Sequence, residues 1–288
     1  MLTLKVSFRQ CSFLQLLAKF GQMSRNVPSN ATNESKKNRF PDLLPVYHCF
    51  LKYFQLILFI AVEKKRPYLQ TLGKNSSSNY INACSVMSYR KMSSFIATQS
   101  PLPSTIEDFW RLVFDWKCPL IVMLNQLDKN DGTVCKYWPD AGSLQYGHIT
   151  VELKMMQKEH RYISRLFEVD HAHAQKPISV QHLQLNSWDE NKPWDIYNFI
   201  KDIEKLQQDF RMVEPTVIHC INGVGRSGVV LAVKSEIERI EAEKKIDVFT
   251  TVRQMRASNL NFVHTLEEYT LCHQLLKMNP PEATYANI

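Results

Sequence analysis

The pattern of apolar and polar residues from Ser78 onward predicts strands and helices that follow one another along one domain. The expected strands cover 94–98, 119–124, 148–155, 161–169, 178–185 and 216–219. The expected helices cover 104–114, 195–210, 228–243, 248–257 and 265–277, the first with Ser104 as N-cap and Glu107 completing a capping box. Strands mixed with helices, in a chain that ends in helices, predict a single α/β domain with a mixed central sheet flanked by helices.

The pattern is less regular before Ser78. Residues 1–35 are expected to form an extension, with a helix over 11–20 followed by a polar linker. We expect the main domain to cover 36–280 and a tail to cover 281–288. The apolar run 49–62 has fourteen residues and contains Lys52 and Gln55, whereas a membrane-spanning helix needs about 20 apolar residues. A membrane span is therefore disfavoured, and membrane association is left open.

Composition narrows the class of partner. The chain has 288 residues, a formal net charge of +7 and a sequence pI of about 9.0. A basic balance favours acidic partners such as phosphorylated peptides, nucleic acid or anionic membranes. No nucleic-acid motif is present, so we expect no nucleic-acid partner. The seven cysteines are scattered and form no CxxC pair, which disfavours disulfides and zinc and indicates a reducing, cytoplasmic compartment.

The most informative segment is the loop His219-Cys220-Ile221-Asn222-Gly223-Val224-Gly225-Arg226-Ser227-Gly228. It lies between a β-branched strand and an apolar helix. A glycine-bearing loop at a helix N-terminus turns backbone N–H groups inward and forms a cradle for an anion. Gly223 and Gly225 are expected to supply the positive φ angles that a cradle needs. The expected phosphate-binding residues are Ile221, Asn222, Gly223, Val224 and Gly225.

Three side chains of this loop predict its chemistry. Arg226 can hold a phosphate through two parallel hydrogen bonds. The positive field of the cradle favours the thiolate of Cys220, an activated nucleophile toward a bound phosphoryl group. Ser227 is expected to donate a hydrogen bond to the sulfur and to help it leave in a second step. A buried cysteine beside an incidental arginine is the alternative, and the spacing argues against it. This chemistry implies no metal and no cofactor.

The loop resembles the signature of cysteine-dependent phosphatases, and other segments resemble classical protein-tyrosine phosphatases. These segments are Asn79 to Ala83, Ile96 to Leu102 with Ser100 where Gly is usual, Asp108 to Arg111, Ile121 to Leu124, and Tyr137-Trp138-Pro139. The resemblance runs from about Lys36 to Lys277. It looks closest to the second, membrane-distal domain of MAM-type receptor tyrosine phosphatases. It implies a protein-tyrosine-phosphatase fold, phosphotyrosine proteins as partners, and a place in the cytoplasm or in the intracellular part of a receptor.

The segment 37–40 resembles the family's substrate-recognition loop, in which an aromatic ring stacks on phosphotyrosine. Phe40 would supply that ring and Asp42 would hold the substrate backbone, with core packing of Phe40 as the alternative. In the family only a few residues separate this loop from a basic segment. Here 46–62 intervenes before Glu63-Lys64-Lys65-Arg66. We therefore interpret 46–62 as an apolar insertion, such as a retained intron.

The general acid departs from the family pattern. The family carries it as an Asp in a Trp-Pro-Asp loop about 35 residues before the cysteine. Trp138-Pro139-Asp140 has those letters but lies too early, so we interpret it as a decoy. Ser187-Trp188-Asp189-Glu190 has the expected position, with Asp189 in place of Pro and Glu190 where the acid belongs. Both carboxylates are candidate catalytic residues.

A second departure lies near the C-terminus. His264 and Glu268 stand where active family members carry two Gln residues that position the hydrolytic water. His264 is a candidate for that role, and a packed or surface histidine is an equal alternative. A third departure is Thr133-Val134-Cys135, where a Lys is common in the family.

Together these features predict a protein-tyrosine phosphatase that forms a cysteinyl-phosphate intermediate with reduced turnover. The alternative is a weak or inactive module that binds phosphotyrosine or docks a partner phosphatase domain. A dual-specificity or lipid phosphatase is a third interpretation, against which the 37–40 segment argues.

Overall fold

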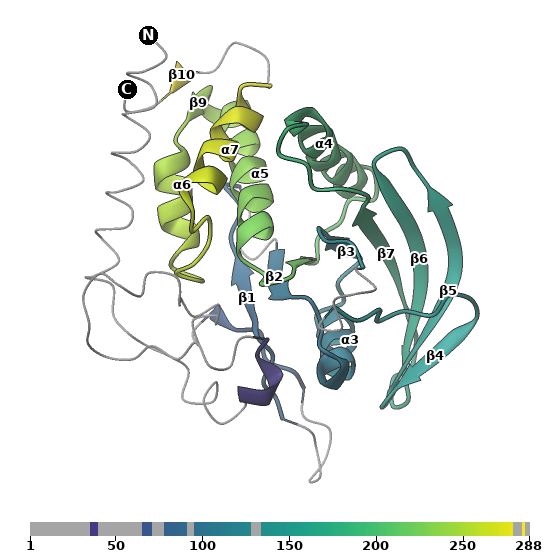
Figure 1. Ribbon diagram of the computed structural model, residues 1–288. Coiled ribbons are helices and arrows are strands. Elements are labelled where there is room, and N and C mark those ends of the chain that lie inside the picture. The colour runs from purple at the N-terminus through teal and green to yellow at the C-terminus, as the bar shows by residue number, and fades with distance from the viewer. Residues whose placement is uncertain are drawn as a thin grey trace.

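The computed structural model describes residues 35–39, 65–70, 78–90, 95–127, 134–278 and 284–285. At its centre is an eight-stranded sheet with the order β1-β2-β8-β3-β7-β6-β5-β4 (Figure 1). The pairs β2–β8, β8–β3 and β3–β7 are parallel, and the other neighbours are antiparallel. The strands are β1 (Ala83–Val86), β2 (Phe95–Gln99), β3 (Leu120–Met123), β4 (Ser143–Tyr146), β5 (Ile149–Lys158), β6 (Tyr162–His171), β7 (Ile178–Leu185) and β8 (Thr216–Cys220). The predicted mixed sheet is confirmed.

Helices cover both faces of this sheet, so the domain has two hydrophobic cores. Along β3, Leu120 and Val122 enter the core shared with α4 to α7, while Ile121 and Met123 enter the core shared with α3. The helices are α3 (Ile106–Asp115), α4 (Pro193–Asp209), α5 (Gly225–Glu243), α6 (Val248–Met255) and α7 (Leu266–Leu276), with short η2 (Ser35–Lys37) and η4 (Pro103–Thr105). A small sheet pairs β9 (Lys245–Ile246) with β10 (Thr284–Tyr285).

The helix α5 lies inside this arrangement and fixes where the signature loop sits. Its run Val229 to Val233 is fully or almost fully buried, which is typical of a helix enclosed on all sides. Gly228 allows the segment before α7 to approach closely, because a Cβ there would lie 2.9 Å from the backbone N of Val263. The N-terminus of α5 is therefore held rigidly against its surroundings.

The predicted elements match the structure in type, with differences at their ends. The strands β1, β4, β9 and β10 were not predicted. The capping box of Ser104 and Glu107 is wrong, because η4 precedes α3 and the Thr105 hydroxyl accepts a hydrogen bond from the Leu102 N–H at 2.9 Å. Pro103, which lacks an N–H, is suited to start such a turn.

Several sequence predictions concern residues outside the described ranges. They are the helix over 11–20, the insertion 46–62, and the substrate contacts Phe40 and Asp42. These stay predictions, as do the domain limits 36 and 280. Among the helices that the structure describes, none has both the length and the apolar character needed to cross a bilayer.

Candidate active site

Cys220 is the last residue of β8, at the edge where the parallel strands β2, β8 and β3 end. Its carbonyl accepts a hydrogen bond from the Ser100 N–H at 2.8 Å, and the carbonyl of His219 accepts one from the Leu124 N–H at 2.9 Å. Ser100 directly follows β2 and Leu124 directly follows β3. Both neighbouring strands thus fix the backbone of Cys220 at the carboxyl edge of the sheet, where open α/β sheets bind ligands.

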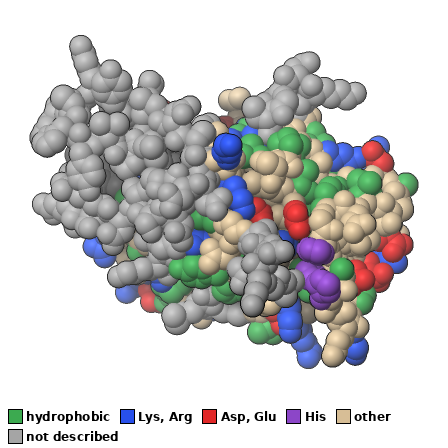
Figure 2. Space-filling view, turned by 90° about the horizontal axis from the view of Figure 1, so that it is seen from below, with side chains coloured by type: hydrophobic (Ala, Val, Ile, Leu, Met, Phe, Trp, Pro, Cys, Tyr) green, Lys and Arg blue, Asp and Glu red, His purple; other side chains and the backbone are tan. Residues whose placement is uncertain are grey.

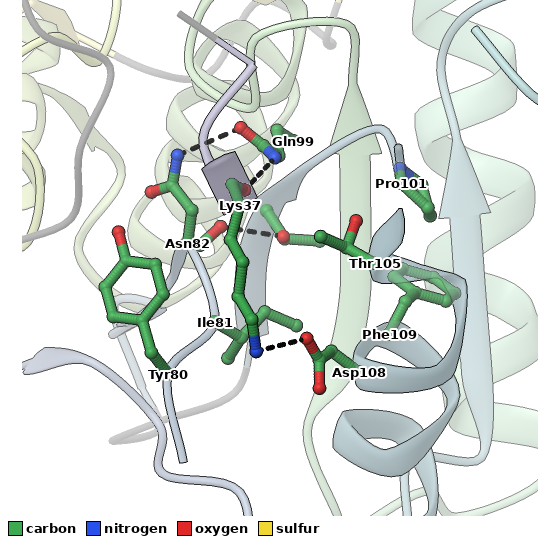
Figure 3. A pocket seen from close by; sticks show the side chains of 10 residues that line it. Lys37, Tyr80, Ile81, Asn82, Gln99, Pro101, Thr105, Asp108 and Phe109 are labelled. Carbon is green, nitrogen blue, oxygen red and sulfur yellow. Dashed lines mark hydrogen bonds and ion pairs between the residues drawn. The ribbon is translucent and has the colours of Figure 1, made fainter. Parts of the chain in front are cut away.

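The segment that precedes Phe40 is tied to this same edge (Figure 3). Gln99 pairs with Cys220 across the β2–β8 ladder. The Gln99 side chain donates to the carbonyl of Lys37 and accepts from the N–H of Arg39, both at 3.0 Å. Lys37 also forms an ion pair with Asp108 of α3 at 2.7 Å. The 35–39 segment therefore lies beside the strand end that carries Cys220, as the predicted substrate-recognition role requires.

The two loop glycines serve different purposes. Gly223 has a φ of +79°, and a Cβ there would lie 2.6 Å from the carbonyl carbon and oxygen of Thr98. The expectation of a positive φ at Gly225 is wrong, because Gly225 is the first residue of α5 and is not in the left-handed region. A Cβ at Gly225 would lie 2.4 Å from Oε1 of Glu268. Because this carboxylate is the far end of a flexible side chain and can shift, the distance shows how closely Glu268 approaches α5 and does not by itself require glycine at 225.

Asn222 places its side chain inside the loop. Its Oδ1 accepts hydrogen bonds from the N–H groups of Val224 at 3.1 Å and Gly225 at 3.2 Å, and from the Cys220 thiol at 3.3 Å. These contacts explain why α5 begins at Gly225 rather than at the predicted Gly228, since the first free N–H groups of the helix find an acceptor.

Arg226 and Ser227 lie in the first turn of α5. The Arg226 guanidinium donates to the Leu124 carbonyl at 3.2 Å and lies 5.6 Å from the centre of the Trp188 ring. Ser227 is fully buried, and its hydroxyl makes no hydrogen bond with any described residue. The expected bond from Ser227 to the sulfur is thus not formed in this conformation, in which the sulfur faces Asn222.

The remaining loop residues contribute in different ways. Ile221 is 38% exposed, so its side chain lies at the surface beside the loop. Val224 is buried in the core under α5 and presents only its backbone N–H to the loop.

The predicted acid segment lies between β7 and α4. Glu190 is exposed, and its Oε1 accepts a hydrogen bond from the Trp188 indole at 3.3 Å. Asp189 closes a turn, because its Oδ1 accepts from the Asn191 N–H at 3.0 Å. The contact between Trp188 and Arg226 joins this segment to the signature loop.

The segment Trp138-Pro139-Asp140, interpreted above as a decoy, lies in a different environment from Glu190. Trp138 is buried under the guanidinium of Arg165, whose carbon lies 4.7 Å from the ring centre. The Asp140 side chain is 95% exposed and pairs with Lys136. Among described residues no contact joins Asp140 to Cys220, so the structure gives no support to it as the acid.

His264 and Glu268 form a pair against the start of α5. Glu268 Oε2 accepts from the His264 N–H at 2.8 Å and lies 3.1 Å from His264 Nδ1. Glu268 is also the N3 residue of a capping box with Thr265, whose hydroxyl accepts from the Glu268 N–H at 3.1 Å. Sequence analysis missed this cap, although the Thr-x-x-Glu spacing signals it.

A buried chain of hydrogen bonds lies behind the loop and was not predicted. Arg165 donates to His182 Nδ1 at 3.3 Å, and His182 Nε2 lies 2.9 Å from the Tyr137 hydroxyl. That hydroxyl lies 2.7 Å from His219 Nε2, and His219 Nδ1 lies 3.2 Å from the Ser100 hydroxyl. Because arginine can only donate, His182 accepts at Nδ1 and donates from Nε2 to the Tyr137 oxygen. The Ser100 hydroxyl donates to Asn125 Oδ1 at 3.0 Å, so it accepts from His219 Nδ1, and the Tyr137 proton points to His219 Nε2. Burial lowers the pKa of His219 to about 3, and the positive charge of Arg39 contributes to the same shift to a smaller extent.

Other histidines gather on the face seen in Figure 2. The rings of His148, His171 and His173 have centroids 5.4 to 6.2 Å apart. His171 ends β6 beside the start of β7, whereas Cys220 ends the parallel strand β8, so the two groups occupy opposite edges of the sheet. Within the described part of the chain no group of three such side chains is placed to hold a metal.

The fold and site define a class: an α/β domain in which a central strand ends in a cysteine and a short glycine-bearing loop leads from it into a buried helix. A family model described as protein-tyrosine phosphatase matches residues 34–277. This chain therefore belongs to the protein-tyrosine phosphatase family, and the predicted family and fold are confirmed.

The chain is similar to several receptor-type tyrosine-protein phosphatases. The chain is 34% identical over 257 residues to receptor-type tyrosine-protein phosphatase alpha of Mus musculus, covering 88% of this chain and 28% of that protein. It is 32% identical over 237 residues to the epsilon type of Homo sapiens (79% and 34%) and over 246 residues to the V type of Rattus norvegicus (83% and 13%). The chain thus spans about a third or less of the length of these relatives.

Proposed function

We propose that this chain hydrolyses phosphotyrosine in proteins through a cysteinyl-phosphate intermediate, with reduced turnover. The observation that carries the proposal is the position of Cys220 at the end of β8, directly before the N-terminus of α5. Helix N-termini favour anions, and Arg226 adds a fixed positive charge in the first turn.

The first step transfers the phosphoryl group to the enzyme. The Cys220 thiolate attacks phosphorus, and the bond from phosphorus to the tyrosine oxygen breaks. Glu190 acts as general acid and gives its proton to the leaving oxygen. Arg226 and the loop N–H groups hold the phosphoryl oxygens.

The second step releases phosphate. Water attacks phosphorus, the sulfur–phosphorus bond breaks, and its electron pair returns to Cys220. Glu190 takes the proton of the attacking water, and His264 orients that water. Ser227 donates a hydrogen bond to the leaving sulfur. The buried hydroxyl of Ser227 supports this role, since it has no competing acceptor among the described residues.

We assign the acid to Glu190 because its neighbour is already engaged. Asp189 accepts a backbone N–H at 3.0 Å, so it shapes the turn that presents Glu190. The Trp188–Arg226 contact supports a link between this turn and the phosphate site. In this conformation Glu190 is exposed, so catalysis requires the 186–192 segment to move toward the loop.

A second candidate function is a phosphotyrosine-binding or docking module with little or no turnover. It is favoured by the contact of Cys220 with Asn222 Oδ1, which requires a protonated sulfur, and by the carboxylate of Glu268 against the start of α5. The receptor-type names of the relatives support a place within a longer receptor, and docking to a partner phosphatase domain in the cytoplasm belongs to this second proposal. The specific resemblance to a second receptor domain stays a prediction.

The test is hydrolysis of p-nitrophenyl phosphate and of a phosphotyrosine peptide by the full chain. We expect Cys220→Ser to lose all turnover and Glu190→Gln to lose about 10²-fold, mainly on the peptide, whose leaving group is poorer. Asp189→Asn and Asp140→Asn are the matched carboxylate controls. Loss of turnover in either control, with Glu190→Gln unimpaired, contradicts the acid assignment. Peptide binding without turnover above Cys220→Ser supports the docking module instead.

A further inference from the structure

The anion cradle at the start of α5 is occupied by a side chain of its own loop. Asn222 Oδ1 lies 3.1 Å from the Val224 N, 3.2 Å from the Gly225 N and 3.3 Å from the Cys220 sulfur. A phosphate oxygen bound at this helix start would use the same backbone N–H groups and would face the same sulfur.

The atom in that position must be the amide oxygen. Val224 and Gly225 present backbone N–H groups, which can only donate, so the Asn222 –NH2 group is excluded from their side. The same oxygen has no proton to give, so the contact with Cys220 exists only while the sulfur carries its proton. A thiolate at 3.3 Å would face the negative end of the carbonyl dipole.

Helix capping alone explains part of this arrangement. An asparagine side chain often accepts a backbone N–H two residues on, and Asn222 does so with Val224, the N-cap residue of α5. Capping does not require the third contact, which reaches the predicted nucleophile. Asn222 is also only partly buried, next to the exposed Ile221, so its side chain has a route to solvent.

We propose that Asn222 is a built-in competitor of the phosphate group, and that its side chain must rotate out before a phosphoryl group binds. This inference rests on the proposed function, because it concerns the same loop. Rotation frees two N–H donors and removes the acceptor that holds the thiol proton. Anion binding and formation of the thiolate are therefore coupled through one side chain.

The test measures binding of inorganic phosphate to the full chain by calorimetry and alkylation of Cys220 by iodoacetamide at constant pH. Asn222→Ala is expected to bind phosphate about tenfold more tightly, equivalent to about 1.4 kcal/mol, and to be alkylated faster. Asn222→Asp keeps the shape, adds a negative charge and should bind phosphate at least about tenfold more weakly. Asn198→Ala, on α4 outside the cradle, is the control, and Cys220→Ser gives the background alkylation.

Each outcome bears on the inference separately from turnover. If folded Asn222→Ala binds phosphate no more tightly than wild type, Asn222 is not a competitor, even where hydrolysis is observed. If Asn222→Ala does not fold, Asn222→Asp decides, and wild-type phosphate affinity in that variant overturns the inference. Tighter phosphate binding in Asn222→Ala without any hydrolysis keeps the inference and removes the proposed reaction.

Discussion

The Tyr137 hydroxyl lies 2.7 Å from Nε2 of His219, the residue directly before Cys220. The same hydroxyl lies 2.9 Å from Nε2 of His182 on β7. Because Arg165 donates to the other nitrogen of His182, the Tyr137 oxygen accepts from His182 and its proton points to His219. One buried hydroxyl thus joins β8, the strand that ends in Cys220, to β7, which lies beyond β3 in the sheet.

Replacing this hydroxyl leaves two buried partners without a bond. We expect Tyr137→Phe to lower the free energy of unfolding by about 1–3 kcal/mol, because the His219 acceptor and the His182 donor are both desolvated. Urea unfolding measures the change. Tyr146→Phe is the control, since the Tyr146 hydroxyl makes no hydrogen bond to another described residue and this side chain is partly exposed. Equal losses in the two variants would show that the network adds no stability.

The buried histidines predict how stability depends on pH. Burial lowers the pKa of His219 to about 3 and holds the pKa of His182 well below its usual range. The unfolded chain, whose histidines titrate near pH 6.5, then binds more protons than the folded one. Stability is fully present above about pH 6.5 and falls by about 1.4 kcal/mol per pH unit for each histidine as the pH drops.

The free energy of unfolding is measured with urea for wild type and for His182→Gln. The pH runs from about 7.5 to about 5, a range that spans the usual histidine pKa of about 6.5. The variant should lose part of the slope. His160→Gln, which changes an exposed histidine, is the control. A wild-type slope that His182→Gln leaves unchanged would refute the assignment to this network.

Gly223 and Gly142 separate backbone strain from steric clash. Both have positive φ, +79° and +62°, but a Cβ at 142 meets nothing within 4 Å, whereas one at 223 meets the Thr98 carbonyl at 2.6 Å. We expect Gly142→Ala to cost about 1–2 kcal/mol. Gly223→Ala should cost about 3 kcal/mol or more and abolish phosphate binding. Thermal unfolding measures the loss of stability in each variant, and calorimetry measures phosphate binding. Equal losses of stability in the two variants would contradict the close approach of the Thr98 carbonyl to residue 223.

The carboxylate of Glu268 lies against the start of α5 and opposes a bound anion. Glu268→Gln removes the charge and keeps a side chain able to complete the capping box with Thr265. We expect phosphate to bind about three- to tenfold more tightly, an effect reduced by solvent screening and by salt. The neighbouring exposed Glu267→Gln carries the same charge change and should have little effect. Equal gains in both variants would indicate a general charge effect rather than a local one.

Much of the fold was predictable because its signals are local. Apolar patterns located the strands β2, β3 and β5 to β8 and the helices α3 to α7, since each buries a face that the sequence marks. β1 is only four residues long and β4 is largely exposed, so neither has such a signal. The start of α5 was misplaced because the Asn222 side chain accepts from N–H groups two and three residues further on, and apolar periodicity does not specify the rotamer that allows these contacts.

By itself, the sequence determined the family, the identity of the loop around Cys220 and the unusual residues at 190, 264 and 268. Those depend on residue type and spacing along one chain. Only the tertiary structure decided what each side chain faces: that the Asn222 oxygen lies inside the loop against Cys220, that Glu268 lies against the start of α5, and that Tyr137 bridges two histidines. These relationships join residues that are distant in sequence or depend on a side-chain rotamer, and hydrophobic patterns specify neither.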